Sequence, residues 1–265
     1  MEEKVIIITG ASKGIGYSCA ALFMEKGHRV YSLARSNCGI NGVNSIICDI
    51  TNGEGLKKAI DSIFAAEKRI DVLINNAGAG ISGSVEKTDP ADARRLFELN
   101  FFALFEAIKY TVPYMRSRRS GKIINIGSVA GDMHVPFQAF YSASKAAVQA
   151  LSNCIRGELE PFGIRIAAVL PGDTRTGFTD AREKDFETDD PDYGLRISRS
   201  IKTMEKDERK GMSAEKVARI IYKAVQKRNP RPVYVVGFSY KFFMFLNRIL
   251  PKRFVQFILN KMYAS

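Results

Sequence analysis

Residues 5–16, Val-Ile-Ile-Ile-Thr-Gly-Ala-Ser-Lys-Gly-Ile-Gly, decide the fold that this sequence predicts. The run Val5–Thr9 is apolar and β-branched, as expected for a strand buried on both faces. Gly10, Gly14 and Gly16 follow it, and a helical pattern begins at Ile15. Glycines permit a tight turn and a close approach to a ligand, and the helix N-terminus offers unpaired N–H groups to a pyrophosphate. A glycine turn between the first strand and the first helix therefore predicts a dinucleotide site.

The rest of the chain repeats this order of strand, turn and helix. Apolar runs predict strands at Val5–Thr9, His28–Leu33, Ser45–Cys48, Val72–Ile74, Lys122–Ile126, Ile164–Leu170 and Val233–Val236. Helical patterns cover Ile15–Lys26, Gly55–Lys68, Ala91–Arg116, Phe140–Glu160 and Ala214–Lys227. Such alternation implies a parallel sheet with right-handed crossovers and helices on both faces. We therefore predict one α/β domain over residues 1–237, a Rossmann-type, doubly wound parallel sheet, followed by an extension over residues 238–265.

Composition excludes several classes of protein. The 265 residues are 46% hydrophobic and 26% charged, which is close to the average for globular proteins and excludes a disordered or collagen-like chain. The cysteines and histidines form no metal-ligand spacing, and no signal peptide precedes the first strand. The sequence therefore predicts reduced thiols, no metal site and a cytoplasmic protein. One segment, Thr176–Met212, is charged, irregular and longer than a usual connection, so we predict a functional loop there.

The net charge of +12 is confined to one end of the chain. Residues 216–265 contain 11 Lys and Arg and no Asp or Glu, which leaves 29 basic and 28 acidic residues in the rest. The body is therefore nearly neutral, and a general basic face for nucleic acid is not predicted. We expect no nucleic-acid partner.

The basic extension predicts two short helices, 239–250 and 252–263, separated at Pro251. In the second, one face is apolar (Phe254, Val255, Ile258, Leu259, Met262) and the other is polar (Lys252, Arg253, Gln256, Asn260, Lys261). Each helix is shorter than the roughly 20 residues that span a bilayer. Three interpretations stay open: packing on the body or on a second subunit, peripheral contact with an anionic membrane surface, and covering of the substrate entrance.

The end of the second strand bears on the choice of dinucleotide. Sites for NAD usually place an acidic residue there, which binds the ribose 2′-hydroxyl. Here the strand ends Ser32-Leu33-Ala34-Arg35-Ser36, without a carboxylate. Arg35 and Lys13 are instead placed to bind a 2′-phosphate, although both also fit ordinary solvated cations. We predict NADP(H) as the cofactor.

A second group of residues predicts acid/base chemistry. In a helix over Phe140–Glu160, Tyr141 and Lys145 lie one turn apart on one face. An ammonium near a phenol is expected to lower its pKa from about 10. Ser128, at the end of a predicted strand, is then available to hold a substrate oxygen while Tyr141 exchanges its proton. A Tyr-x-x-x-Lys pair by itself is common, so the other motifs decide its meaning.

Taken together, the motifs resemble the classical short-chain dehydrogenase/reductase family over about residues 4–236. The matching segments are the turn Thr9–Gly16, Asp49 after the third strand, Asn75-Asn76-Ala77-Gly78, the set Asn100, Ser128, Tyr141 and Lys145, and the Pro-Gly-x-x-x-Thr segment Pro171–Thr176. The resemblance implies a seven-stranded sheet and hydride transfer between a nicotinamide and an alcohol or ketone. It also implies a mobile lid over about residues 176–212, and a homodimer or homotetramer formed through the helices Ala91–Arg116 and Phe140–Glu160.

The resemblance also implies roles for individual residues. Tyr141 is the expected acid/base, Lys145 binds the nicotinamide ribose, Ser128 positions the carbonyl, and Asn100 holds a water in a proton relay. The expected cofactor contacts are Gly10, Ser12, Lys13, Gly14, Ile15, Gly16, Arg35, Asp49, Ile50, Asn76, Ala77, Gly78, Tyr141, Lys145, Pro171, Gly172, Thr174 and Thr176.

Substrate contacts are expected from Ala79–Ser84, Gly131–Phe140 and the loop after Gly172. Met133, Val135, Pro136 and Phe137 predict an apolar wall, with His134 either on the rim or bonded to the substrate. We therefore expect a small lipophilic alcohol or ketone: a steroid, a retinoid or a fatty-chain carbonyl, with a hydroxysteroid-like enzyme as the model. The alternatives are a 3-oxoacyl-carrier-protein reductase, which the long extension disfavours, and a non-catalytic NADP(H)-sensing regulator, which the intact Ser128, Tyr141 and Lys145 disfavour.

Overall fold

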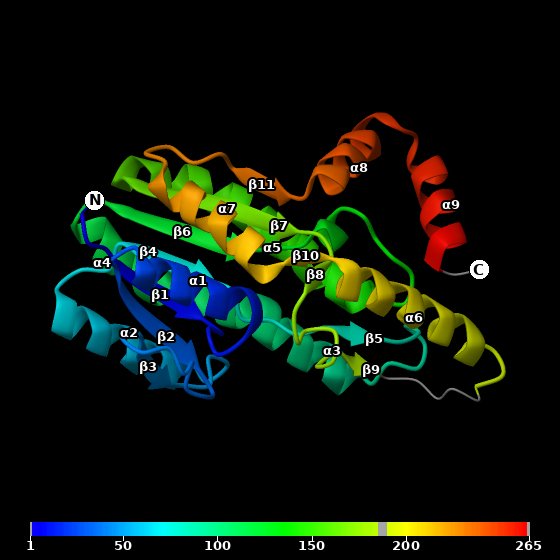
Figure 1. Ribbon diagram of the computed structural model, residues 1–265, viewed down its shortest axis with the longest axis horizontal. Helices are drawn as coiled ribbons and strands as arrows, with labels where there is room; N and C mark the ends of the chain where they lie inside the picture. The colour runs from blue at the N-terminus through cyan, green and yellow to red at the C-terminus, as the bar shows by residue number, and fades with distance from the viewer. Residues whose placement is uncertain (1, 185–189, 264–265) are drawn as a thin grey trace.

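A seven-stranded parallel sheet forms the centre of the computed structural model, which describes residues 2–184 and 190–263 (Figure 1). Its strand order is β11-β7-β6-β4-β1-β2-β3. The strands are β1 (Val5–Thr9), β2 (Arg29–Ala34), β3 (Asn44–Ile47), β4 (Val72–Asn75), β6 (Gly121–Ile126), β7 (Ile164–Pro171) and β11 (Val233–Val236). Because β1 pairs with β2 on one side and with β4 on the other, the order reverses at β1. Ligands of doubly wound sheets bind beside such a switch point.

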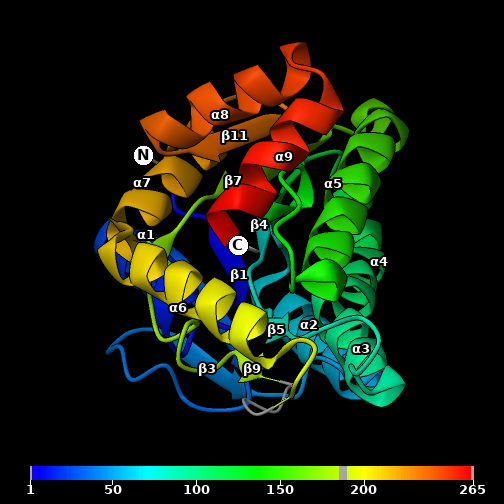
Figure 2. The ribbon, with the colours of Figure 1, turned by 90° about the vertical axis from the view of Figure 1, so that its right-hand side faces the viewer.

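Helices cover both faces of the sheet, as predicted. The helices α1 (Gly14–Glu25) and α7 (Ala214–Gln226) lie on one face, and α2 (Gly53–Glu67), α4 (Ala103–Ser117) and α5 (Ala139–Leu159) lie on the other (Figures 1 and 2). Alternate residues of β1 divide between the two layers: Ile6 and Ile8 pack with α1 and α7, while Val5 and Ile7 pack with α2 and α4. This two-sided burial explains why the strands are apolar almost throughout.

The predicted helix Ala91–Arg116 is interrupted, so that prediction is wrong in its middle. The chain forms α3 (Pro90–Phe97), a π-helical turn η1 (Glu98–Phe102) and then α4. A π-turn is rare and is frequent at functional sites. Here it contains Asn100, which is buried.

The segment Thr176–Met212 is ordered in its described part, where an irregular lid was predicted. It contains the 17-residue helix α6 (Gly194–Lys210), and two pairs of short strands lie beside or within it. These strands pair as β8 (Thr174–Arg175) with β10 (Met212–Ser213) and β9 (Glu183–Lys184) with β5 (Ile81–Ser82). Although α6 is rich in charged residues, one of its faces is apolar. This apolar stripe consists of Ile197, Ile201 and Met204 and packs against Val135 and Phe137. Residues 185–189 of the predicted lid lie outside the described residues.

The C-terminal extension forms the two predicted helices, α8 (Phe238–Ile249) and α9 (Lys252–Tyr263), which meet at Pro251. They lie beyond β11, over the carboxyl ends of the strands, and Tyr263 packs with the apolar stripe of α6 (Figure 2). Short 3-10 turns, η2 (Val129–Gly131) and η3 (Glu160–Phe162), complete the fold. Within residues 2–184 and 190–263, no helix has the length and apolar character needed to cross a bilayer.

Candidate active site

A cavity of about 1380 Å³ lies at the carboxyl ends of the strands. Ligand pockets usually measure roughly 300–1000 Å³, so this cavity has room for a dinucleotide together with a second ligand. The glycine turn after β1 forms one end of it, and α6, α8 and α9 contribute to the other. The cavity therefore adjoins the switch point of the sheet, where the sequence predicted a nucleotide.

The glycine turn has the geometry of a phosphate cradle. Gly10 and Gly14 have φ values of +68° and +60°, a region that favours glycine. A Cβ at Gly14 would come within 3.3 Å of the Thr176 Cβ, so any side chain there would fill the gap between the turn and Thr176. Helix α1 begins with no side-chain cap and no acidic residue in its first turn. Its first N–H groups are thus available to an anion, and the site fits a pyrophosphate.

The turn is held in place by β4. The Thr9 hydroxyl accepts hydrogen bonds from the N–H groups of Asn76 and Ala77 at 3.0 and 3.1 Å, and the Asn76 amide donates to the carbonyls of Thr9 and Gly10. Gly16 does not line the cavity; a Cβ there would collide with the Asn76 amide and the Gly10 carbonyl. Its role is therefore close packing of the turn, while every other predicted cofactor contact lines the cavity.

The structure places Lys13 and Arg35 on the rim of the cavity with their side chains exposed. Asp49, also on the rim, accepts hydrogen bonds from the Thr51 hydroxyl at 2.7 Å and the Thr51 N–H at 3.0 Å. These bonds, with a smaller contribution from the charge of Arg35, lower the pKa of Asp49. Within the described parts of the chain, no side-chain hydrogen bond engages either cation, so both remain available to an anionic ligand.

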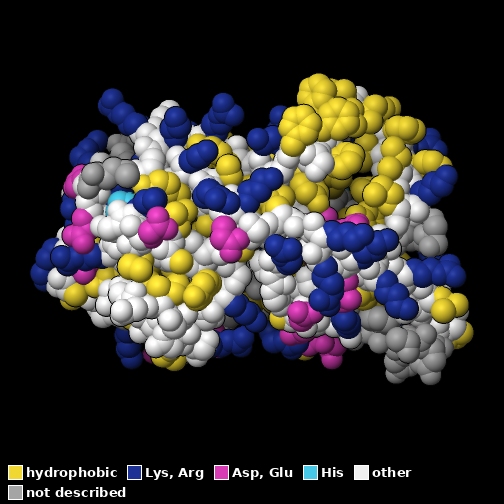
Figure 3. All heavy atoms as spheres, viewed as in Figure 1, with side chains coloured by type: hydrophobic (Ala, Val, Ile, Leu, Met, Phe, Trp, Pro, Cys, Tyr) yellow, Lys and Arg dark blue, Asp and Glu magenta, His cyan; other side chains and the backbone are white. Residues whose placement is uncertain are grey.

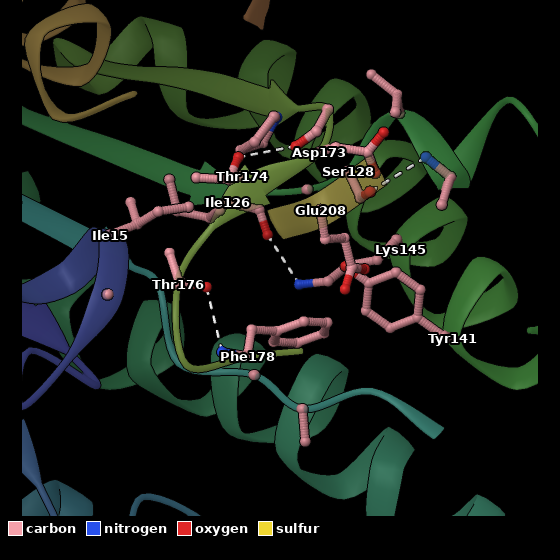
Figure 4. Close-up of a pocket in the computed structure, with 18 of the residues that line it drawn as sticks. Ile15, Ile126, Ser128, Tyr141, Lys145, Asp173, Thr174, Thr176, Phe178 and Glu208 are labelled. Carbon is pink, nitrogen blue, oxygen red and sulfur yellow. Dashed lines mark hydrogen bonds between the residues drawn. The ribbon is translucent and has the colours of Figure 1, made fainter. Parts of the chain in front are cut away.

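Three of the four predicted catalytic side chains, Ser128, Tyr141 and Lys145, meet in this cavity (Figure 4). Tyr141 and Lys145 come from the first turns of α5, and Ser128 follows β6. The Ser128 side chain acts on the Tyr141 hydroxyl and lowers its pKa, and Lys145 Nζ lies 5.9 Å from the centre of the Tyr141 ring. Lys145 Nζ also donates to the Ile126 carbonyl at 3.1 Å, which fixes the ammonium against the end of the strand.

Asn100 lies behind this group and does not line the cavity. Its Oδ1 accepts from the Ala79 N–H at 2.9 Å, and its Nδ2 donates to the Ala79 carbonyl at 3.0 Å and to Ser144 Oγ at 3.1 Å. A Cβ at Gly78 would lie 3.1 Å from Asn100 Oδ1 and 3.4 Å from Lys145 Nζ. Asn100 thus fastens the segment after β4 to α5; the water relay stays a prediction.

The pKa of Tyr141 differs from the prediction. Burial raises it to about 12, the negative charges of Glu208 and Asp173 act in the same direction, and the Ser128 hydrogen bond and Arg182 oppose them. The expected lowering by Lys145 is therefore wrong: burial sets the direction, and Lys145 is not among the groups that shift the pKa of Tyr141. A phenol with this pKa is protonated at neutral pH. It therefore holds the proton that the reduction of a ketone requires, although the raised pKa makes it a weaker acid than a free tyrosine.

Burial lowers the pKa of Lys145 to about 8, since its side chain is almost fully enclosed. Below pH 8 the lysine is charged in both the folded and the unfolded chain. Between pH 8 and its usual pKa of 10.5, only the unfolded chain binds the proton, so stability contributed by this group rises with pH. From pH 7 to pH 10 we expect the difference in free energy of unfolding between wild type and Lys145→Met to shift by roughly 2–3 kcal/mol in favour of the wild type.

Urea unfolding at the two pH values measures this shift. Lys58→Met, at an exposed position of α2, is the matched control and should show no comparable change. A difference between wild type and Lys145→Met that stays constant with pH would contradict an enclosed lysine.

The three predicted substrate segments contribute unequally. From the first, Ala79 lines the cavity; from the second, Met133, Val135 and Gln138; and from the third, residues including Asp173 and Phe178. Pro136 and Phe137 of the predicted apolar wall lie outside the lining, because Phe137 packs against α6. His134 also lies outside it, with Nδ1 3.4 Å from the Ala130 carbonyl, so neither a rim position nor a substrate contact is confirmed for it.

A polar network that the sequence did not predict lies beside Tyr141. Arg182 and Glu208 form an ion pair, with the Arg182 side chain 1% exposed, and the Thr179 hydroxyl donates to Glu208 at 2.7 Å. The Tyr240 hydroxyl of α8 donates to the Asp173 carboxylate. The Pro-Gly-x-x-x-Thr motif predicted that the segment containing Asp173 lies at the cofactor site. It did not predict the hydrogen bond between Asp173 and Tyr240.

The fold and the site define an oxidoreductase that uses a nicotinamide cofactor. The chain belongs to the short-chain dehydrogenase family, whose model matches residues 4–187. It is 39% identical to the 3-ketodihydrosphingosine reductase of Bacteroides thetaiotaomicron, over 100% of this chain and 99% of that protein.

Solved structures agree with this assignment. A short-chain dehydrogenase from Streptomyces avermitilis superposes with a TM-score of 0.84 at 29% identity, covering 92% of each chain. One from Burkholderia cenocepacia, in complex with NADP, has a TM-score of 0.77 at 25% identity and covers 97% of this chain and 98% of its own. A further one from Burkholderia phymatum, with a TM-score of 0.79 at 23% identity and covering 94% and 92%, holds NAD. Both nicotinamide dinucleotides thus occur among the structural relatives.

Proposed function

We propose that the protein is an NADPH-dependent reductase of a long-chain ketone, of the kind that 3-ketodihydrosphingosine represents. This choice selects the fatty-chain carbonyl from the lipophilic substrates expected above, in place of a hydroxysteroid. The similarity to the Bacteroides reductase extends over the full chain, including the α8–α9 extension. Lys13 and Arg35 on the rim support NADPH as the dinucleotide.

One observation carries the proposal: the apolar inner side of α8 and α9 lines the same cavity as Ser128 and Tyr141. The contributing side chains are Phe243, Leu246, Leu250, Val255, Ile258, Leu259 and Met262. A linear alkyl chain can bury its methylenes along such a wall while its carbonyl lies at the tyrosine, at roughly 0.8 kcal/mol per buried methylene. The family's catalytic group and a lipid-sized apolar wall therefore line one cavity, which is open to solvent at Phe243, Ile258 and Met262.

The catalytic group then acts as follows. NADPH, when bound, supplies the hydride. Ser128 donates a hydrogen bond to the substrate oxygen, and Tyr141, protonated at neutral pH, delivers its proton to that oxygen. Lys145, fixed to the Ile126 carbonyl, keeps a positive charge beside the phenol as it becomes a phenolate.

The substrate suggested by the Bacteroides relative is a long-chain base with an amine next to the ketone. Three carboxylates line the cavity: Asp207 and Glu208 on α6, and Asp173 after β7. The charges of Glu208 and Asp173 raise the pKa of Tyr141, so both act on the Tyr141 hydroxyl. Carboxylates at this place suit an ammonium beside the reacting carbonyl. A neutral steroid ketone offers no such group.

Asp207→Asn should therefore raise KM for the amino ketone about 10-fold, the value of one charge-assisted hydrogen bond near 1.4 kcal/mol. Its kcat, and its KM for an uncharged long-chain ketone, should change by less than about 2-fold, because asparagine keeps the shape of the side chain and can still accept the hydrogen bond that the Tyr263 hydroxyl donates to Asp207 at 3.3 Å. Steady-state NADPH oxidation with both ketones measures this. Equal increases in KM for the two ketones would show that Asp207 acts on the pocket rather than on the amine.

The proposal as a whole is tested by following NADPH oxidation with purified protein and a panel of ketones. The panel contains 3-ketodihydrosphingosine, a steroid ketone and a 3-oxoacyl carrier protein. We expect the highest kcat/KM with the first. A preference for the steroid or the carrier-protein thioester would overturn it in favour of those enzymes, and tight NADPH binding without any turnover would indicate a nucleotide sensor.

A further inference from the structure

We propose that α8 and α9 form a docking surface for an anionic lipid leaflet, from which a lipid ketone enters the cavity. The route of entry rests on the proposed function, whereas the docking itself does not. Figure 3 shows apolar side chains gathered over these two helices at one end of the molecule.

The first observation is a row of exposed apolar side chains, here called the outer stripe: Phe242, Phe245, Ile249, Phe254 and Phe257. Each is between 50% and 62% exposed, and none lines the cavity. The three on α8 are spaced three and four residues apart, so they share one face of the helix. Large exposed apolar patches are rare on soluble proteins and mark surfaces that contact a partner or a membrane.

Helices α8 and α9 together form a helical hairpin, residues 238–263, whose side toward the cavity is apolar as well. Here α9 differs from the sequence prediction, which placed five residues on one apolar face. Four of the five residues assigned to its apolar face, Val255, Ile258, Leu259 and Met262, line the cavity, while Phe254 lies on the outer stripe. At the start of α8, Phe238 is 87% exposed and also lines the cavity. The hairpin is therefore the wall between the cavity and the outer stripe, and Phe238 marks a place where the two surfaces meet.

Charge decides which partner fits. The hairpin carries the exposed cations Lys241, Arg248, Lys252, Arg253 and Lys261, and no Asp or Glu occurs from residue 216 to the end. A second copy of the chain, packed about a two-fold axis on the outer stripe, would bring these cations against one another. An anionic leaflet offers both an apolar interior for the aromatic side chains and phosphates for the cations. The complementary partner is therefore a lipid surface.

The length of the helices fixes the mode of contact. Each is 12 residues long, or about 18 Å, which is shorter than the roughly 30 Å hydrocarbon core. They can thus lie in the interface with the outer stripe among the acyl chains, as amphipathic helices do. This orientation turns the exposed Phe238 and the adjoining cavity rim toward the lipid.

Flotation with vesicles tests the docking, without ketone or NADPH. Wild-type protein should float with phosphatidylcholine vesicles that contain phosphatidylglycerol, less with phosphatidylcholine alone, and less again in high salt, which screens the cations. Phe242→Ser with Phe245→Ser should lower the partition coefficient roughly 10–100-fold, because two aromatic side chains lose their burial. The matched control, Val85→Ser with Leu195→Ser, removes two apolar side chains outside the hairpin that are more exposed than Phe242 and Phe245, and it should bind as the wild type does.

Two results would overturn the docking surface: equal flotation of the wild type and the hairpin variant, or no wild-type binding to anionic vesicles. Loss of a dimer in the hairpin variant, seen by light scattering without vesicles, would instead assign the outer stripe to a subunit interface. Thermal unfolding and NADPH binding confirm that both variants are folded.

Entry from the leaflet is tested by turnover. The hairpin variant should lose activity on a vesicle-borne ketone and keep it on a water-soluble ketone, because Phe242 and Phe245 lie outside the cavity. Equal loss on both ketones would overturn the entry route. Absence of turnover on every long-chain ketone would overturn the proposed function and leave the docking surface standing, because flotation involves no ketone.

Discussion

Tyr141→Phe should lower kcat by about 10²–10⁴-fold while leaving the Kd for NADPH close to that of the wild type. The substitution removes the hydroxyl on which Ser128 acts, and it keeps the ring that packs beside Phe178 and under Lys145. Because the ring stays, the cavity keeps its shape. Turnover is measured by NADPH oxidation and cofactor binding by fluorescence titration.

A matched control comes from Tyr110 on α4, which packs against the core beside the sheet. Tyr110→Phe should retain kcat within about 2-fold, which is the behaviour of a substitution that removes no proton donor. If Tyr141→Phe kept more than about a tenth of kcat, another group would have to supply the proton. Water from the open side of the cavity would then be the first candidate.

The pairing of Tyr141 with Lys145 was predictable because both residues lie in one helix, where spacing alone determines which side chains share a face. The glycine turn was predictable for the same reason, since strand, turn and helix are adjacent in sequence. The strand order at β1 places these local features at the same edge of the sheet.

The π-turn at Asn100 was not predictable from periodicity, because its cause is distant in sequence. The Asn100 side chain bonds to Ala79 and Ser144, which are 21 and 44 residues away. Likewise Arg182 meets Glu208 and Asp173 meets Tyr240 only in the folded chain. The raised pKa of Tyr141 follows from burial and from these carboxylates, so a local argument from Lys145 alone gave the wrong direction.

Lys13→Ala combined with Arg35→Ala should raise the Kd for NADPH about 10²-fold and change the Kd for NADH by less than about 3-fold. The two cations lie on the rim of the cavity, at the ends of the glycine turn and β2, where a ribose 2′-phosphate is expected. A charge-assisted hydrogen bond contributes roughly 1.5–3 kcal/mol, and exposure to solvent places this pair at the low end of that range. Two such bonds correspond to the expected factor, at 1.4 kcal/mol for each tenfold change.

A control variant separates this effect from a general loss of positive charge. Lys58→Ala with Arg219→Ala removes two exposed cations, on α2 and α7, that do not line the cavity. This control lowers the net charge equally and should leave the ratio of the two Kd values unchanged. NADH carries the same pyrophosphate and adenine but no 2′-phosphate, so its binding reports the glycine turn alone. Comparable Kd values of the wild type for NADH and NADPH would contradict a role for the two cations in choosing the cofactor, and Asp49 would then be the group to examine for a hydrogen bond to the adenine.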